Sequence, residues 1–156
     1  MSDAITLEPH NPDWAAQAGR VKTQLQAALG RSGRGGAIWS AHHIGSTAVA
    51  GIRAKPVLDI CLEVYPNLLD DAQIAALEGL GYMYKGDNGI VGRQFFRDDP
   101  RTVHLHVYKL DSPEVAQHKL FRDYLNAHPD HASRYDALKL ELSTRYHHDR
   151  EAYTLG

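Results

Sequence analysis

The sequence has only one cysteine, Cys61, among its 156 residues. A single thiol cannot form an intrachain disulfide, and a Cys-based zinc site needs several thiolates. Secreted proteins held together by disulfides are therefore excluded.

Long apolar runs are also missing. The opening stretch MSDAITLEPHNPDW has neither a basic segment nor an apolar segment of the kind found in secretory signals, and no later run approaches the length of a membrane span. We therefore expect a cytoplasmic protein with no membrane partner.

Neither sign of charge is in large excess. The formal charge is −2, and the 17 Lys and Arg residues are scattered along the chain. A nucleic-acid-binding protein usually concentrates basic residues in a patch or stripe. Nucleic acid is thus not an expected partner, whereas a small anionic ligand is compatible with this composition.

The chain is long enough for one compact domain with a sizeable core, because 43% of its residues are hydrophobic. We expect a single domain over residues 1–156. Hydrophobic spacing and turn residues predict the following elements: helices over 11–30, 67–81, 113–128 and 129–148, strands over 37–44, 57–65 and 102–108, and a hairpin over 82–98 with its turn at Asn88-Gly89. This order predicts an α/β or α+β fold with helices packed on a sheet.

Three of these elements carry specific expectations. The first helix should have Asn11 as its N-cap, Pro12 at its first position, and an apolar stripe of Trp14, Ala18, Val21, Leu25 and Leu29. The segment 31–36 should be a flexible break. The last helix should have Tyr135, Leu138, Leu142 and Tyr146 spaced along one face.

Chemistry is suggested first by the stretch HIGSTAVAGIRAKPVLDI. A turn of small residues after a strand can expose backbone N–H groups to phosphate oxygens, and Gly45, Ser46 and Thr47 form such a turn. The spacing does not fit a Walker loop, because Lys55 is followed by proline. Asp59 lies on the next strand, on the face opposite Leu58 and Ile60, where a carboxylate could hold a divalent metal against a bound phosphate.

Together with RQFFR, HLHV and LFRDYLNAHPDHASRYDALKLEL, this stretch resembles the GrpB-like family, whose domain also occurs fused to dephospho-CoA kinases. The stretch also resembles the signature of the polymerase-β-like nucleotidyltransferase superfamily. In that pattern a hydrophobic residue precedes Gly-Ser, and an Asp follows after a gap, on an apolar strand. The resemblance implies a minimal nucleotidyltransferase fold with a mixed sheet flanked by helices and a helical C-terminal segment. Fold alone does not settle activity.

Carried over from the superfamily, Gly45, Ser46 and Thr47 contact the triphosphate and Asp59 is the first metal ligand. The sequence departs from the pattern at the second carboxylate position, which is Cys61. Glu63 shares the strand face but lies roughly 13 Å further along at ~3.3 Å per residue. His104 and His106 occupy the later strand where a third carboxylate is expected.

Three interpretations of the histidines remain open. Asp59, His104 and His106 could bind a transition metal and support a transferase or a hydrolase. The histidines could instead carry protons or contact phosphate, while Asp59 holds magnesium that the nucleotide largely coordinates. Alternatively, catalysis is lost and nucleotide binding is retained.

Other charged and histidine residues complete the prediction. His43, as part of the HIGST stretch, is expected to face the pocket rather than His42. Lys55, Arg93 and Arg97 could neutralise a triphosphate. Three residues of the C-terminal helices, Arg122, Tyr124 and Lys139, could close one side of the cleft or simply pack. The remaining histidines are expected at helix ends and on surfaces, namely His10, His118, His128, His131, His147 and His148.

The sequence therefore predicts a metal-dependent nucleotidyltransferase that transfers a nucleoside monophosphate from a nucleoside triphosphate to a small acceptor. Its divalent metal would be Mg²⁺, with Mn²⁺ or Zn²⁺ as alternatives. Two other functions are retained: a non-catalytic module that binds or senses a nucleotide or a CoA-like molecule, and a metal-dependent hydrolase that uses Asp59, His104 and His106.

Overall fold

The structure, a computed structural model, describes residues 7–30, 35–99 and 102–145, and these contain four α-helices and five strands. In chain order the elements are α1 (Asp13–Leu29), β1 (Ala37–Ile44), the short 3₁₀ helix η1 (Ser46–Ala48), β2 (Leu58–Tyr65), α2 (Asp71–Gly79), β3 (Tyr82–Tyr84), β4 (Gln94–Asp98), β5 (Val103–Lys109), α3 (Pro113–Ala127) and α4 (Pro129–Arg145).

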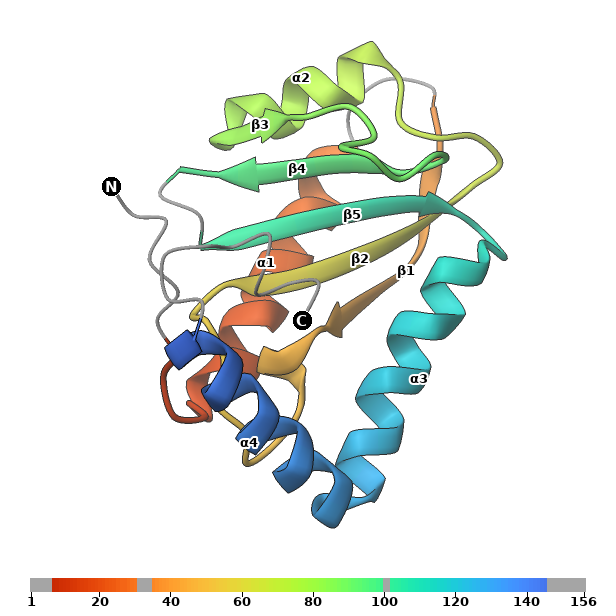
Figure 1. Ribbon diagram of the computed structural model, residues 1–156. Coiled ribbons are helices and arrows are strands. Elements are labelled where there is room, and N and C mark those ends of the chain that lie inside the picture. The colour runs from red at the N-terminus through yellow and green to blue at the C-terminus, as the bar shows by residue number, and fades with distance from the viewer. Residues whose placement is uncertain (1–6, 31–34, 100–101, 146–156) are drawn as a thin grey trace.

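The strands form one mixed sheet in the order β1-β2-β5-β4-β3. Strands β2 and β5 run parallel through its centre, from the pair Leu58–Val103 to the pair Val64–Lys109. The other neighbouring strands are antiparallel. The predicted α/β class, mixed sheet and C-terminal helices are confirmed. In Figure 1, α1 passes behind β2 and β5, while α3 and α4 lie on the opposite side, toward the viewer.

One face of the sheet carries the main hydrophobic core. The predicted stripe of α1 packs here, with Leu25 fully buried and Val21 partly buried at its edge. The α2 helix adds Leu77 and begins with a capping box, in which Asp70 and Gln73 bond each other's backbone N–H groups. The strand residues beneath the helices are Leu58, Ile60, Leu62, Val64, Val103, Leu105 and Val107.

The other face is largely polar, as the alternation of β2 and β5 predicts. A small apolar cluster of Ile44, Cys61, Tyr108 and Val115 packs α3 against this face. The polar residues beside the cluster are Asp59 and Glu63 of β2 and His104 and His106 of β5. The two faces of the same strands therefore differ sharply in chemistry.

Two local predictions need small corrections. Helix α1 begins at Asp13, with Pro12 as its N-cap, and the Asn11 side chain accepts a hydrogen bond from the Asp13 N–H at 2.9 Å. The hairpin of β3 and β4 is confirmed, and Asn88 and Gly89 both have positive φ. Its loop is longer than a two-residue turn, because pairing stops at the Gly86 carbonyl, which accepts from the Phe95 N–H.

The apolar spacing of α4 does not mark its most buried side, although Tyr135 packs against the apolar cluster that contains Val49 and Leu125. Leu138 is 47% exposed, whereas Ala132, Lys139 and Ser143 are buried. The helix turns this side inward because it packs on the loop after η1, where polar side chains bond the backbone. Tyr146 and residues 31–34 of the predicted break lie outside the described residues. No helix in the described parts of the chain is both long and apolar enough to cross a membrane.

Candidate functional site

The Gly-Ser-Thr turn lies directly against Asp59. Gly45 follows the last residue of β1 and has φ 75° and ψ −172°, a conformation that side chains other than glycine rarely adopt. A Cβ atom at Gly45 would lie 2.7 Å from Asp59 Oδ2. The turn and the carboxylate are therefore parts of one site.

The turn presents two backbone N–H groups. The Gly45 and Ser46 carbonyls accept from the N–H groups of Ala48 and Val49, which closes η1. Within the described residues, the N–H groups of Ser46 and Thr47 have no hydrogen-bond acceptor. These two donors at the start of η1 are suited to phosphate oxygens. The Thr47 hydroxyl is already engaged, because it lies 2.8 Å from His43 Nε2 and Thr47 is buried.

Asp59 is held by a chain of hydrogen bonds that starts in the β3–β4 loop. Arg93 donates to the carbonyls of Asp87 and Asn88, and its Nη1 lies 3.2 Å from His106 Nδ1. His106 Nε2 lies 3.0 Å from Asp59 Oδ1. A guanidinium can only donate, so Nδ1 of His106 accepts and its Nε2–H donates to Asp59. Arg93 thus fixes the tautomer of His106.

His104 approaches the same carboxylate oxygen less closely. Its Nδ1 lies 3.6 Å from Asp59 Oδ1. The Phe95 ring contacts both imidazoles, with its centroid 5.3 Å from each, and the Arg93 guanidinium lies 4.6 Å from that ring centroid. Of the two histidines, His104 is the one whose ring nitrogens are not both committed within the described residues.

The surroundings of Asp59 favour its ionised form. Burial by itself would raise the pKa of Asp59, but the contacts of His104 and His106 with its carboxylate outweigh this effect and hold the pKa below its ordinary range. Asp59 is therefore a carboxylate at neutral pH, and its side chain is 29% exposed. It remains accessible to a ligand.

The second carboxylate position is inert. Cys61 is fully buried, and burial raises the pKa of its thiol to about 12. Glu63 is engaged elsewhere: its Oε1 lies 2.5 Å from Ser40 Oγ and 3.0 Å from His42 Nε2. Burial opposes ionisation of Glu63, but these hydrogen bonds prevail and lower its pKa. On this strand Asp59 is the carboxylate beside the turn.

The expectation that His43 faces the pocket is wrong. Ile44 pairs with Asp59 and His42 pairs with Cys61, so His42 shares the face of Asp59 while His43 points to the other face. There His43 bonds Thr47, and burial lowers the pKa of its imidazole to about 4. Its main-chain carbonyl accepts a hydrogen bond from Arg122 of α3.

The predicted cations have different environments. Arg97 pairs with His104 across β4 and β5 and is partly exposed beside it. Arg93 is buried, and its N–H groups form hydrogen bonds to the β3–β4 loop and to His106. Lys55 acts electrostatically on Lys139, a residue on which the charge of Asp59 also acts. Arg97 and Lys55 thus remain candidates for phosphate contact, whereas Arg93 positions His106.

Lys139, expected either to close one side of the cleft or simply to pack, is electrostatically coupled to Asp59. It is buried, its Nζ donates to the Arg53 carbonyl at 2.7 Å, and Asp59 is among the charges acting on it. Burial, with Lys55 nearby, lowers the pKa of Lys139 to about 8. His118, expected on the surface, lies against the site with its ring centroid 5.7 Å from that of His106.

The α3–α4 hairpin holds the loop after the turn. The Asn126 side chain accepts from the Ala50 N–H at 2.9 Å and donates to the Ala48 carbonyl at 3.0 Å. Asp136 accepts from the N–H of Arg53 at 2.7 Å and from its guanidinium at 2.6 Å. Sequence reasoning missed Asn126 and Asp136, since nothing local marks a side chain that bonds a distant backbone.

The side chains around Asp59 limit which metal could bind there. In the described parts of the chain, no group of three or more His, Cys, Asp and Glu side chains is arranged to hold a metal ion. Asp59 alone suits Mg²⁺, which binds readily through one carboxylate plus substrate phosphates and water. His106 would have to give up a hydrogen bond to Arg93 or Asp59 to become a ligand.

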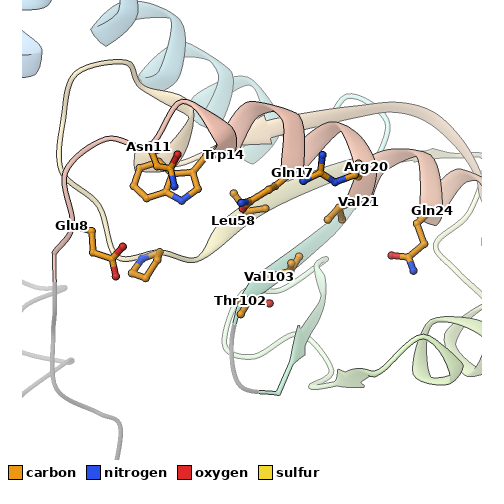
Figure 2. A pocket seen from close by; sticks show the side chains of 11 residues that line it. Glu8, Asn11, Trp14, Gln17, Arg20, Val21, Gln24, Leu58, Thr102 and Val103 are labelled. Carbon is orange, nitrogen blue, oxygen red and sulfur yellow. The ribbon is translucent and has the colours of Figure 1, made fainter.

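A separate groove lies on the opposite face of the sheet, between α1 and the first residues of β2 and β5 (Figure 2). Its volume is about 660 Å³. Glu8 and Arg20 give it one charge of each sign, and the rest of its lining combines amide side chains such as Gln17 with apolar ones such as Trp14. Balanced charge makes this groove a poorer anion site than the turn at Gly45.

Comparison with known proteins fits this architecture. The GrpB protein family matches residues 4–156. The chain belongs to the GrpB family. The crystal structure of the conserved protein GrpB from Enterococcus faecalis superimposes with a TM-score of 0.82 at 30% identity, covering 95% of this chain and 88% of that one. The fold described above is thus the GrpB fold.

Two curated relatives are also similar in sequence. The UPF0157 protein PA4798 of Pseudomonas aeruginosa is 39% identical over 99% of this chain, and the UPF0157 protein YqkA of Bacillus subtilis is 35% identical over 94% of it. The matched parts make up 63% and 42% of those two proteins. The chain thus spans less than two thirds of either relative, and their names state no activity.

Proposed function

We propose that this GrpB-family protein binds a nucleoside triphosphate at Gly45, Ser46, Thr47 and Asp59, with the fold acting as a minimal nucleotidyltransferase. The reaction would transfer the nucleoside monophosphate to a small acceptor. Phosphate and carboxylate must lie within a few ångströms of each other for a nucleotide and its metal to bind together.

One observation carries the proposal: the turn touches the carboxylate. The 2.7 Å separation between a Cβ at Gly45 and Asp59 Oδ2 favours glycine at this position, and Gly45 directly precedes the Ser46 and Thr47 N–H groups. Amide donors next to a single ionised carboxylate suit a phosphate that reaches the protein with a divalent cation. A loop that bound phosphate without a metal would bind it less tightly beside a carboxylate, because the two negative charges repel each other.

The residues divide the work as follows. The turn amides and the Ser46 hydroxyl bind phosphate oxygens, while Lys55 and Arg97 offset the charge of the triphosphate. Asp59 holds Mg²⁺, which would neutralise phosphate charge when bound. Arg93 and His106 keep the Asp59 carboxylate in a fixed orientation.

In the transfer step, an oxygen of the acceptor forms a bond to the α-phosphorus, and the bond from that phosphorus to the bridging oxygen breaks, so that pyrophosphate leaves. The proton of an attacking hydroxyl needs an acceptor. We assign that role to His104. The other histidine beside Asp59, His106, uses both ring nitrogens in hydrogen bonds.

A second candidate is binding without catalysis, with a nucleotide or a CoA-like molecule as ligand. Cys61 favours it, because a fully buried thiol with a pKa of about 12 cannot replace the second carboxylate that two-metal transfer uses. Binding of the phosphates at the turn would survive this loss. The occurrence of similar domains fused to dephospho-CoA kinases supports a CoA-like ligand.

Calorimetric titration of the metal-free chain with ATP, GTP, CTP, UTP and CoA, with and without Mg²⁺ or Mn²⁺, tests both candidates. We expect metal-dependent triphosphate binding that is lost in Asp59→Ala, followed by pyrophosphate release once an acceptor is supplied. Glu63→Gln is the matched control, because it removes a carboxylate from the same strand face but away from the turn.

The outcomes separate the candidates. Binding without pyrophosphate release across a panel of hydroxyl and phosphate acceptors would support the binding module. Binding that is unaffected by Asp59→Ala would contradict the proposed site, and no binding under any condition would refute the nucleotide assignment.

A further inference from the structure

We propose a transition-metal site at the corner between α3 and α4, formed by His128 and His131 with Tyr124 beside them. The site is independent of Asp59 and of the proposed nucleotide function. It would take Zn²⁺, Ni²⁺ or Cu²⁺, with water completing the coordination.

His128 is prepared as a ligand by the backbone. Its Nδ1 lies 2.8 Å from the Tyr124 carbonyl oxygen. A carbonyl can only accept, so Nδ1 carries the proton and the lone pair is on Nε2. Metal-binding histidines commonly have this arrangement, in which one ring nitrogen donates to an oxygen and the other binds the metal.

His131 is oriented by the same tyrosine. Its Nδ1 lies 2.9 Å from Tyr124 Oη. The hydroxyl oxygen can accept from Nδ1–H while its own proton turns to solvent, which again leaves Nε2 as the ligand. Within the described residues neither Nε2 has a hydrogen-bond partner, and both histidines are exposed.

The separation of the rings fits a shared ion. Their centroids are 5.6 Å apart with an interplanar angle of 57°. Two imidazoles bound to one ion through bonds of 2.0–2.1 Å place their centroids roughly 5–6 Å apart at ordinary ligand angles. The Tyr124 ring stacks on His128 with centroids 4.1 Å apart and meets His131 edge-on at 5.2 Å, so both rings are held before metal binding.

Metal binding at this corner should affect the loop that follows η1. Asn126, two residues before His128, bonds the backbone of Ala48 and Ala50 in the loop that follows η1. An ion that joins the end of α3 to the start of α4 therefore stiffens the element that anchors this loop. Metal occupancy and the mobility of the loop should be linked.

The test is a titration of the full, metal-free chain with Zn²⁺, followed by the histidine ring resonances in two-dimensional NMR. We expect the His128 and His131 signals to shift together at one equivalent. Affinity should be higher for Cu²⁺ than for Ni²⁺ or Zn²⁺. Tyr124→Phe, which removes Oη but keeps the stack and the carbonyl, should weaken binding by about 10–100-fold.

Variants locate the ion. His128→Gln and His131→Gln should each abolish the paired shift, with folding checked by circular dichroism. Asp59→Ala and the double change His147→Gln with His148→Gln should leave it intact, because Asp59 belongs to the other candidate metal site and His147 and His148 are not part of the proposed one. Unmoved His128 and His131 signals in the wild-type titration, or wild-type affinity in the two single variants, would overturn the site.

Discussion

The two faces of the central sheet differ although the same strands make both. On the side of α1 and α2, residues such as Ile60, Leu62 and Leu105 are fully buried in one apolar cluster. On the side of α3 and α4, their immediate neighbours Asp59, Glu63 and His106 bond each other or nearby side chains. Alternation along β2 and β5 lets one pair of strands supply apolar packing to one face and a hydrogen-bonded polar cluster to the other.

The comparison also shows how each face is held. Apolar packing stabilises the first face in proportion to the area buried. On the second face, a polar group that loses water without gaining a partner costs free energy, so Glu63 is matched with Ser40 and His42, and His106 with Arg93 and Asp59. Substitutions should therefore act differently on the two faces.

The largest effect is expected on the apolar face. Leu62→Ala should lower the free energy of unfolding by about 2–5 kcal/mol, because a fully buried side chain leaves a cavity. Asp59→Asn on the adjacent face should cost less than half as much while removing metal-dependent triphosphate binding. Urea unfolding of both variants measures this, with Val91→Ala, at an 88% exposed position, as the control. Equal losses of unfolding free energy in Asp59→Asn and Leu62→Ala would contradict the proposed difference between the two faces.

The next effect is expected at the turn. Gly45→Ala should lose about 1–3 kcal/mol from backbone strain, and more from the clash with Asp59. Gly51→Ala is a matched control, since Gly51 has a positive φ of 82° but no atom within 4 Å of its built Cβ. Both variants should be destabilised in thermal unfolding, and only Gly45→Ala should also lose triphosphate binding. Undiminished binding by Gly45→Ala would contradict the assignment of the turn.

A smaller, pH-dependent effect is expected from His43. Its pKa is lowered to about 4, chiefly by burial and also by Lys22, Arg122 and His10, while Asp59 raises it. A histidine kept neutral in the fold gives its full stability above pH ~6.5, and stability falls as the pH drops toward 4, by about 1–3 kcal/mol.

His43→Gln cannot titrate and can still bond Thr47, so its stability should depend less on pH in that range. Urea unfolding between pH 4 and pH 7.5 measures the difference between the two curves. Parallel curves for the wild type and the variant would show that His43 is not buried in its neutral form.

The smallest effect is expected at the loop clamp, by which we mean the two hydrogen bonds from the Asn126 side chain to the backbone of Ala48 and Ala50. Asn126→Ala removes two side-chain hydrogen bonds to the backbone and should cost about 1–2 kcal/mol. Asn126→Asp retains the acceptor for the Ala50 N–H and should lose roughly half as much. Hydrogen exchange of the Ala50 amide should accelerate most in the alanine variant. Unchanged exchange would show that the clamp contributes nothing to the polar face.

Much of the fold follows from local patterns. The stripe of α1 and the alternation of β2 predicted which residues face the core, because periodicity is a property of a single segment. The choice between His42 and His43 failed, since it depends on which residue of β1 pairs with Asp59, and register is set between strands. The most buried side of α4 could not be read from its apolar spacing for a similar reason, because Asp136 and Lys139 contact the backbone of Arg53.

The candidate site was predictable to the same extent. Sequence and family resemblance named Asp59 and the turn, which the structure brings into contact. Neither indicated that Arg93 would be buried against His106. The sequence around an arginine in a hairpin is the same whether its side chain faces solvent or contacts a histidine on another strand. The roles predicted for metal, nucleotide and acceptor stay predictions.

The clamp on the loop also bears on how the protein folds. The bonds from Asn126 to Ala48 and Ala50 span 78 and 76 residues, and those from Asp136 and Lys139 to Arg53 span 83 and 86. A chain synthesised from its N-terminus exposes Gly45, Ser46 and Thr47 long before these partners exist. Because long-range contacts form slowly, the loop after the turn becomes anchored only once both C-terminal helices have been made and have docked. The residues assigned to phosphate leave the ribosome before the helices that anchor their loop, so the loop is completed only after α3 and α4 have docked.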